Sequence, residues 1–353
     1  MAGIILMACS IGIYQANLPV CVSLILIHMI KTVAERQNFN GKNLLMYYFV
    51  CATACIGSLV VYLGLNKIFL WIKDIRLTDY QEIGAYGQTS FGGYLARIRF
   101  AYKEFFMPQD GIRNMYPFSL GKIHDVIVAV YMLLTIYLIF KKMKKNLALG
   151  IQVFVLAILI PLAVNFIYFM CSVSTIHSLM MYGQVFIYVY IIWILSDMMK
   201  EKNIRMCGCI VNATVIMLFV LCLGYCRFDN ICYLKAEYLQ EQTKGYYSTL
   251  ITQIKGVEGY TDEAKVVFIN EFEKEDKTLS DIPQFDEIQI LPYDTRNWIN
   301  DYAWRTTMKM WCGFDPETVD SSIYGQLPEV VEMPSYPDAG SIKMVDGVVV
   351  VKF

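Results

Sequence analysis

Charged residues are scarce in this sequence, and their scarcity defines its class. Only 17% of the 353 residues are Asp, Glu, Lys or Arg, whereas soluble globular proteins carry about 25%. Hydrophobic residues make up 56% of the chain. They gather in runs long enough to cross a bilayer, which takes about 20 apolar residues as helix. The sequence therefore predicts a polytopic membrane protein.

Other absences narrow the possible functions. The net charge is -1 and no basic run forms a nucleic-acid patch, so we expect no nucleic-acid partner. Residues 1–30 are apolar without a basic n-region or a small-residue cleavage site, so we expect no cleaved secretory signal. Most of the eleven cysteines fall in or beside apolar runs, where cysteine behaves as a small hydrophobe. No P-loop, G-x-G-x-x-G, H-E-x-x-H or G-x-S-x-G pattern is present.

The apolar runs predict about six membrane segments. The first is broken near Gln15–Pro19, because proline interrupts helical hydrogen bonding and polar side chains are costly in lipid. After residue 226 the composition becomes mixed and charged, which predicts a small soluble α/β domain over 227–353. The predicted fold is thus an α-helical polytopic membrane domain over 1–226 followed by that domain. The six predicted segments are 3–30, 44–71, 122–140, 147–170, 180–198 and 206–226.

Lysine and arginine in the short loops predict the orientation. Loops 31–42, 141–145 and 200–205 are basic, whereas loop 171–178 holds no Lys or Arg. Basic loops lie on the cytoplasmic side of a membrane. We therefore expect the N-terminus, the long 72–121 loop and the C-terminal domain to be extracytoplasmic.

The long loop and the C-terminal domain carry recognisable local patterns. Residues 92–107 have apolar residues at helical spacing, which predicts an amphipathic helix lying in the membrane interface, with Arg97, Lys103 and Glu104 on its polar face. In the C-terminal domain we expect strands at 265–270 and 287–291.

A helix is predicted at 294–311, with Asp294 as its N-cap. Residues 341–353 predict a hairpin around an Asp346–Gly347 type I′ turn. Trp298, Trp304 and Trp311 are predicted as core, with stacking on sugar rings as the alternative.

The order of several stretches resembles a known family. "SIGIYQA" (10–16) precedes "LNKIFLWI" (65–72) and "LTDYQEIG" (77–84), and the tail runs from "KVVFIN" (265–270) to "VVVKF" (349–353). This order resembles the type-II, phage-like O-antigen glucosyltransferases of bacteria. The resemblance implies transfer of a glucosyl or similar sugar from a polyprenyl-phosphate donor to an envelope glycan, outside the cytoplasmic membrane. Membrane lipid is then the third expected partner.

In members of that family "SIGIYQA" lies in the middle of the chain. Further spans precede it, with an acidic outer loop that supplies the presumed catalytic carboxylate. We therefore expect this sequence to be either a truncated reading or a remnant without that base.

The implied chemistry needs a carboxylate base for the acceptor hydroxyl, and cations or a divalent metal for the leaving phosphate. No motif identifies a metal or another cofactor. Topology restricts the candidates to the outer side and the broken first span. The catalytic candidates are Asp74, Asp79 and Asp110. The substrate-binding candidates are Tyr14, Gln15, Lys67, Tyr80, Gln81, Arg97 and Arg99.

Each candidate has a structural alternative. Lys67 can be a snorkelling anchor, Asp79 a cap, Asp110 an ordinary loop residue, and Gln15 a partner for backbone freed by Pro19. Arg97 and Arg99 can contact lipid headgroups. At the level of the whole chain, the alternatives to a glycosyltransferase are a non-catalytic remnant or accessory membrane protein, and a transporter or flippase, which paired broken helices would favour.

Overall fold

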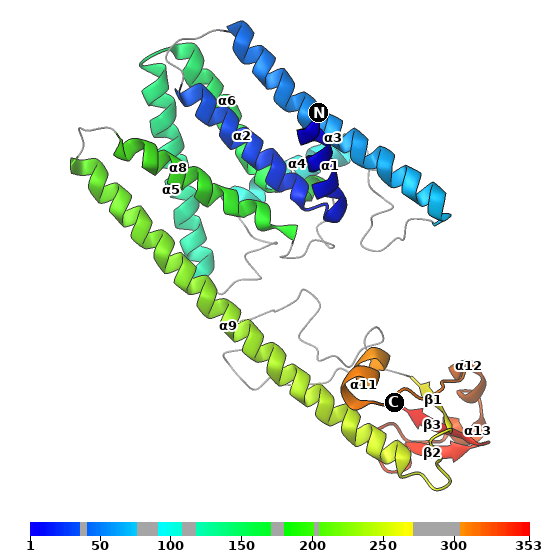
Figure 1. The fold of residues 1–353 in the computed structure, drawn as a ribbon. Coiled ribbons are helices and arrows are strands. Elements are labelled where there is room, and N and C mark those ends of the chain that lie inside the picture. The colour runs from blue at the N-terminus through cyan, green and yellow to red at the C-terminus, as the bar shows by residue number, and fades with distance from the viewer. Residues whose placement is uncertain (36–40, 76–90, 108–117, 171–179, 201–204, 271–303) are drawn as a thin grey trace. The chain divides into compact units, whose positions relative to one another are not determined.

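The computed structural model describes residues 1–35, 41–75, 91–107, 118–170, 180–200, 205–270 and 304–353. These form two compact units, Met1–Tyr225 and Cys226–Phe353, shown in Figure 1. The helices of the first unit are α1 (Ala2–Ile13), α2 (Asn17–Glu35), α3 (Gly41–Lys73), α4 (Phe91–Phe106), α5 (Phe118–Met143), α6 (Leu147–Val164), α7 (Ile167–Met170), the 3₁₀ turn η5 (Tyr182–Gln184) and α8 (Val185–Met199). Helix α9 (Arg205–Lys255) carries residues of both units.

Six helices within the described residues are long and apolar enough to cross a membrane. They correspond one to one with the six predicted segments, so the predicted fold class is confirmed. Helices α2, α5, α6 and α8 pack side by side, and α1 packs on α3. The first predicted segment is two helices, of which only α2 reaches spanning length. Pro19 lies in the first turn of α2, where proline is tolerated, so it begins a helix instead of interrupting one.

Lysine side chains join three helix ends at one end of the first unit. Lys142, on α5, donates a hydrogen bond from its ammonium to the carbonyl of Ala34 near the end of α2. The neighbouring Lys141 forms an ion pair of 3.7 Å with Asp197 near the end of α8. These residues flank the loops predicted to face the cytoplasm, so the lysines of that side also hold the bundle together.

Helix α4 confirms the predicted helix, with one correction to its faces. Its buried residues include Ala101, Glu104 and Phe105, which share one face at i, i+3 and i+4. Glu104, predicted to be on the polar face, is only 3% exposed. That placement was wrong because α4 packs against α7, α6 and α5, and these contacts bury the face that carries Glu104.

The C-terminal unit is built on a three-stranded sheet in the order β1-β3-β2. Strand β3 pairs in parallel with β1 and antiparallel with β2. The predicted hairpin is confirmed: Asp346 and Gly347 join β2 to β3 with φ of 47° and 76°, the positive values that a type I′ turn requires. The elements are β1 (Lys265–Ile269), α11 (Trp304–Cys312), α12 (Ser321–Tyr324), α13 (Pro328–Val331), β2 (Ile342–Val345) and β3 (Val348–Lys352).

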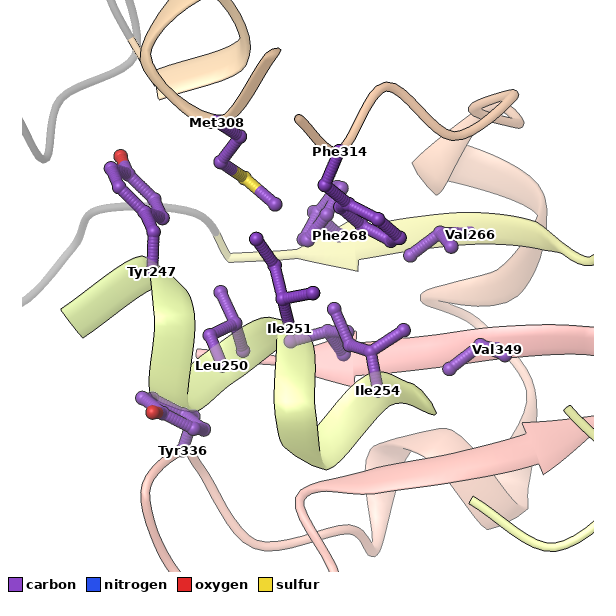
Figure 2. Close-up of a cluster of buried hydrophobic side chains, with 11 residues drawn as sticks. Tyr247, Leu250, Ile251, Ile254, Val266, Phe268, Met308, Phe314, Tyr336 and Val349 are labelled. Atoms are coloured by element: carbon purple, nitrogen blue, oxygen red, sulfur yellow. The ribbon is translucent and has the colours of Figure 1, made fainter. Parts of the chain in front are cut away.

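Helix α9 covers one face of this sheet. Figure 2 shows Leu250, Ile251 and Ile254 pointing from α9 toward the strands, where Phe268 and Val349 meet them. The other face carries a second apolar cluster that includes Val267, Val350 and Val330. Both faces of the short sheet are therefore buried, which explains why β1 and β3 are continuous apolar runs.

Of the other elements predicted for this unit, the strand at 287–291 lies outside the described residues, as do Asp294 and Trp298. The predicted helix at 294–311 is described only from Trp304 onward, as α11. Trp304 packs on Phe268 with ring centroids 4.7 Å apart. Trp311 is exposed and lies under the Lys244 ammonium.

One carboxylate, Asp315, ties α11 to the segment that follows it. Lys309 donates a hydrogen bond of 2.6 Å to Asp315, and Arg305 approaches its other oxygen at 3.4 Å. Chiefly the Lys309 hydrogen bond, and then that of Arg305, holds the pKa of Asp315 below its usual range. The ionised carboxylate is thus the form that the folded unit favours.

Candidate functional site

Hydrogen-bonded polar side chains gather where the helices of the first unit break. Helix α1 ends at Ile13 because Tyr14 adopts an extended backbone with φ of -154°. The Asn17 amide then donates a hydrogen bond of 2.8 Å to the Ser10 carbonyl. The Ser10 carbonyl also accepts the backbone N–H of Tyr14 at 3.2 Å, so the Asn17 amide adds a second bond at the end of α1. Gln15, whose structural alternative was to pair with backbone freed by Pro19, instead donates to the Tyr62 hydroxyl at 3.0 Å.

A second break separates α6 from α7 at Asn165. This side chain is fully buried. Its amide nitrogen donates to the Ala101 carbonyl at 2.9 Å, and its amide oxygen accepts from Gln184 at 2.9 Å. Asn165 therefore joins three elements, α6, α4 and η5, through two hydrogen bonds.

The 3₁₀ turn η5 provides the third irregularity and joins the other two. Tyr182 donates a hydrogen bond from its hydroxyl to the Asn17 side chain, and its ring stacks on Tyr14 with centroids 6.3 Å apart. At Gly183 a Cβ would lie 3.0 Å from the Val164 carbonyl oxygen, so η5 approaches α6 closely. We call Tyr14, Asn17, Asn165, Tyr182 and Gln184 the helix-break cluster.

A buried carboxylate lies one helical turn from this cluster. Glu104 follows Ala101, the acceptor of the Asn165 bond, by three residues on α4. Glu104 also lies close enough to Tyr168 of α7 for the two groups to interact. Ionisable groups buried in membrane proteins are costly and usually functional. The sequence reasoning missed Glu104 because it was placed on the polar face.

The two arginines predicted to bind substrate differ in their surroundings. Arg97 donates from one terminal nitrogen to the carbonyls of Phe169 and Met170, both at 3.2 Å. It thereby pairs with the carbonyls at the end of α7, as a cation at a helix C-terminus does. Arg99 is exposed. Arg97 thus positions α4 against α7, while Arg99 presents its charge to the surroundings.

Two predicted candidates belong to α3 and to the residue that follows it. Both are exposed, unlike the buried Asn165 of the helix-break cluster. Lys67 is exposed. Asp74 is exposed, has a φ of 50° and ends α3. The Ile75 N–H donates to Leu70 at 3.2 Å and the Asp74 N–H to Trp71 at 3.4 Å, which is the Schellman pattern. The backbone of Asp74 performs this capping. Its side chain takes no part in the cap and is exposed.

The remaining predicted site residues, Asp79, Tyr80, Gln81 and Asp110, lie outside the described residues. Within the described ranges no group of three His, Cys, Asp or Glu side chains is arranged to hold a metal ion. The described part of the site therefore offers side-chain amides, phenols, one buried carboxylate and exposed cations.

These features define a polytopic helical membrane protein with a buried polar site at its helix breaks. Comparison with protein families makes the assignment sharper: the sequence model described as "Glucosyl transferase GtrII" matches residues 1–188. The chain belongs to this glucosyl transferase family, and the matched range contains the whole helix-break cluster and Glu104. No curated protein and no solved structure matches the chain.

Proposed function

We propose that the chain transfers a glucosyl residue from a polyprenyl-phosphate donor to a cell-envelope glycan, at the outer face of the bacterial cytoplasmic membrane. Membership of the glucosyl transferase family supports the reaction class. The observation that carries the location is the helix-break cluster, because broken helices are tolerated at membrane depth where they are buried in protein or line a cavity. In this proposal the C-terminal unit is extracytoplasmic.

The bond changes of this reaction assign tasks to the chain. An acceptor hydroxyl attacks the anomeric carbon of the glucosyl group, and the bond from that carbon to the phosphate oxygen breaks. Polyprenyl phosphate leaves with the bonding electrons, while the hydroxyl proton passes to a carboxylate of the protein. The exposed cations Lys67 and Arg99 are the described candidates for stabilising the leaving phosphate.

We infer that Glu104 joins Asp74, Asp79 and Asp110 as a candidate for the carboxylate that accepts the proton. The Glu104 side chain is buried, with 3% of its surface exposed, and a carboxylate can act as a general base. Its place one turn from the Asn165 contact puts it near the helix breaks. Asp74 is exposed at the end of α3. If Asp74 is the base, the proton is accepted at the protein surface.

The test supplies the radiolabelled glucosyl polyprenyl phosphate to membranes that contain the chain and an envelope polysaccharide. We expect label in the polysaccharide, and a loss of about 100-fold or more in Glu104→Gln if the base is removed. Glu35→Gln is the matched control, because Glu35 is an exposed carboxylate on α2. The lipid-linked donor would be wrong if the wild-type chain transferred glucose from a nucleotide sugar alone.

Three irregular helices also favour a second candidate function. The sequence showed one clear break, whereas the structure adds those at Asn165 and at η5. Broken helices meeting at one site are typical of transporters, so a flippase for the glucosyl lipid is the competing function. A flippase would move the labelled lipid across the membrane with its glycosidic bond intact, and the label would stay in the lipid fraction.

A further inference from the structure

A groove of about 840 Å³ lies in the C-terminal unit, beyond the residues that the family model matches. One wall is the end of α9 with the turn after it, including Gln253 and Glu258. The other is the 337–344 loop and strand β2. This volume is within the range of about 300–1,000 Å³ typical of ligand sites.

The loop that forms the second wall is held by backbone hydrogen bonds. The Asp338 N–H donates to Ser335 at 3.0 Å, and the Ser341 N–H donates back to Asp338 at 3.1 Å. Lys352, in the central strand, donates to the Ser341 carbonyl at 3.0 Å. Gly340 adopts a φ of 92°, a conformation available to glycine at no steric cost. The wall is therefore ordered before any ligand arrives, which lowers the entropic cost of binding.

The side chains of the groove are mixed hydrogen-bonding groups. Glu258 and Asp338 offer acceptors, Lys343 a donor, and Gln253 both. The two carboxylates outnumber the single ammonium, which disfavours phosphate and anionic lipid headgroups. Paired acceptors and donors with little net charge suit a ligand rich in hydroxyl groups.

We propose that this groove binds a neutral segment of the acceptor glycan. The assignment rests on the proposed function for the existence of such an acceptor. The described lining residues include no aromatic ring, so each sugar is held by hydrogen bonds and aliphatic contacts without stacking on a ring. Binding would then strengthen with the number of sugars engaged, as a polymeric acceptor allows.

The main competing ligand is an extended peptide. Among the described strands β2 pairs only with β3, so its outer edge is open to strand addition. Peptide recognition of that kind takes its specificity from pockets for alternate side chains. Ile342 and Met344 pack against the core instead, and the other groove side chains are mainly polar. The chemistry therefore favours a glycan over a peptide.

The experiment measures binding to the full chain in lipid nanodiscs. The probe is the neutral polysaccharide of the source cell's envelope, cut to short oligosaccharides and labelled with a fluorophore for anisotropy. Gln253→Trp fills the groove from an exposed position on α9, and Asp338→Ala removes one acceptor. Thr252→Trp is the matched control, because Thr252 is the exposed neighbour of Gln253 and does not line the groove.

We expect both groove variants to weaken binding about ten-fold or more, the effect of losing a hydrogen bond to a charged group, and Thr252→Trp to change it less than two-fold. Unchanged binding in both groove variants would overturn the proposal. So would a loss of binding in Trp311→Ala alone, or binding of envelope peptides without binding of any saccharide.

The same variants separate this proposal from the proposed function. Glycan binding without transfer in the wild-type chain would refute the transferase and leave the groove standing. If Gln253→Trp changed neither the KM for the polymeric acceptor nor kcat, the groove proposal alone would be refuted.

Discussion

Replacing Asn165 by leucine removes both hydrogen bonds of a fully buried amide and puts two methyl groups in place of its oxygen and nitrogen. The Ala101 carbonyl and the Gln184 amide each lose a partner at 2.9 Å. The substitution therefore releases α6 from α4 and from η5 at once. Because the methyl groups of leucine are larger than the groups they replace, part of the effect comes from packing, and the double-mutant cycle below separates that part from the hydrogen bond to Gln184.

The expected cost follows from interhelical hydrogen bonds measured in membrane proteins, which contribute about 0.6 kcal/mol on average and about 1.7 kcal/mol at most. Two such bonds give a destabilisation of about 1–3 kcal/mol for Asn165→Leu. Gln152→Leu is the comparison, because Gln152 accepts one hydrogen bond from Tyr48 at 2.7 Å. We expect it to cost about half as much.

The assay is unfolding of the purified chain in detergent, followed by fluorescence as denaturant is added, together with glucosyl transfer at a temperature where every variant is folded. A double-mutant cycle with Gln184→Leu isolates the coupling between the two amides. Asn165→Leu should also lower transfer, because it releases the breaks from one another. A stability unchanged from wild type, or a cycle with no coupling energy, would show that Asn165 does not join the breaks.

Two further substitutions test features described above. Gly183→Ala places a Cβ 3.0 Å from the Val164 carbonyl oxygen, so we expect lower transfer and a lower melting temperature. Gly12→Ala places a Cβ at an ordinary 3.7 Å from the Tyr62 ring and should behave as wild type. Asp315→Asn tests pH dependence: the folded pKa is depressed chiefly by Lys309, so the stabilisation is present above the unfolded value and is lost as pH falls through the folded one. Hydrogen exchange of the C-terminal unit should show acid destabilisation below about pH 4 in wild type and less of it in Asp315→Asn.

Local chemistry made several elements predictable. Asp346–Gly347 encodes a turn whose two positive φ values few other residue pairs adopt at low cost, and the structure has the hairpin there. The apolar runs and their lengths predicted six spanning helices because membrane insertion depends on local hydrophobicity. These features need no knowledge of distant residues.

The contacts of the site depend on distant residues and were harder to predict. The sequence indicated a break near Gln15–Pro19, but not that Gln15 donates to Tyr62 of α3 or that Asn17 donates to Ser10. Asn165 was missed although it stands four residues after Pro161 in an apolar run, the same combination of proline and amide that marked the first break. That combination could have predicted the second break from the sequence. The hydrogen-bond partner of each amide could not be predicted, because tertiary packing determines it.

Strand order in the C-terminal unit has a consequence for biosynthesis. Strand β3 is central, and β1 and β2 each pair with it, yet it follows both of them in the chain and is made after them. Until Val348–Lys352 emerges, β1 has no described strand partner and its apolar residues are exposed to whatever surrounds the growing chain. The run of four valines in β3 is itself typical of segments prone to aggregate. A chain interrupted before β3 would therefore leave β1 and β2 without the strand that pairs with both of them.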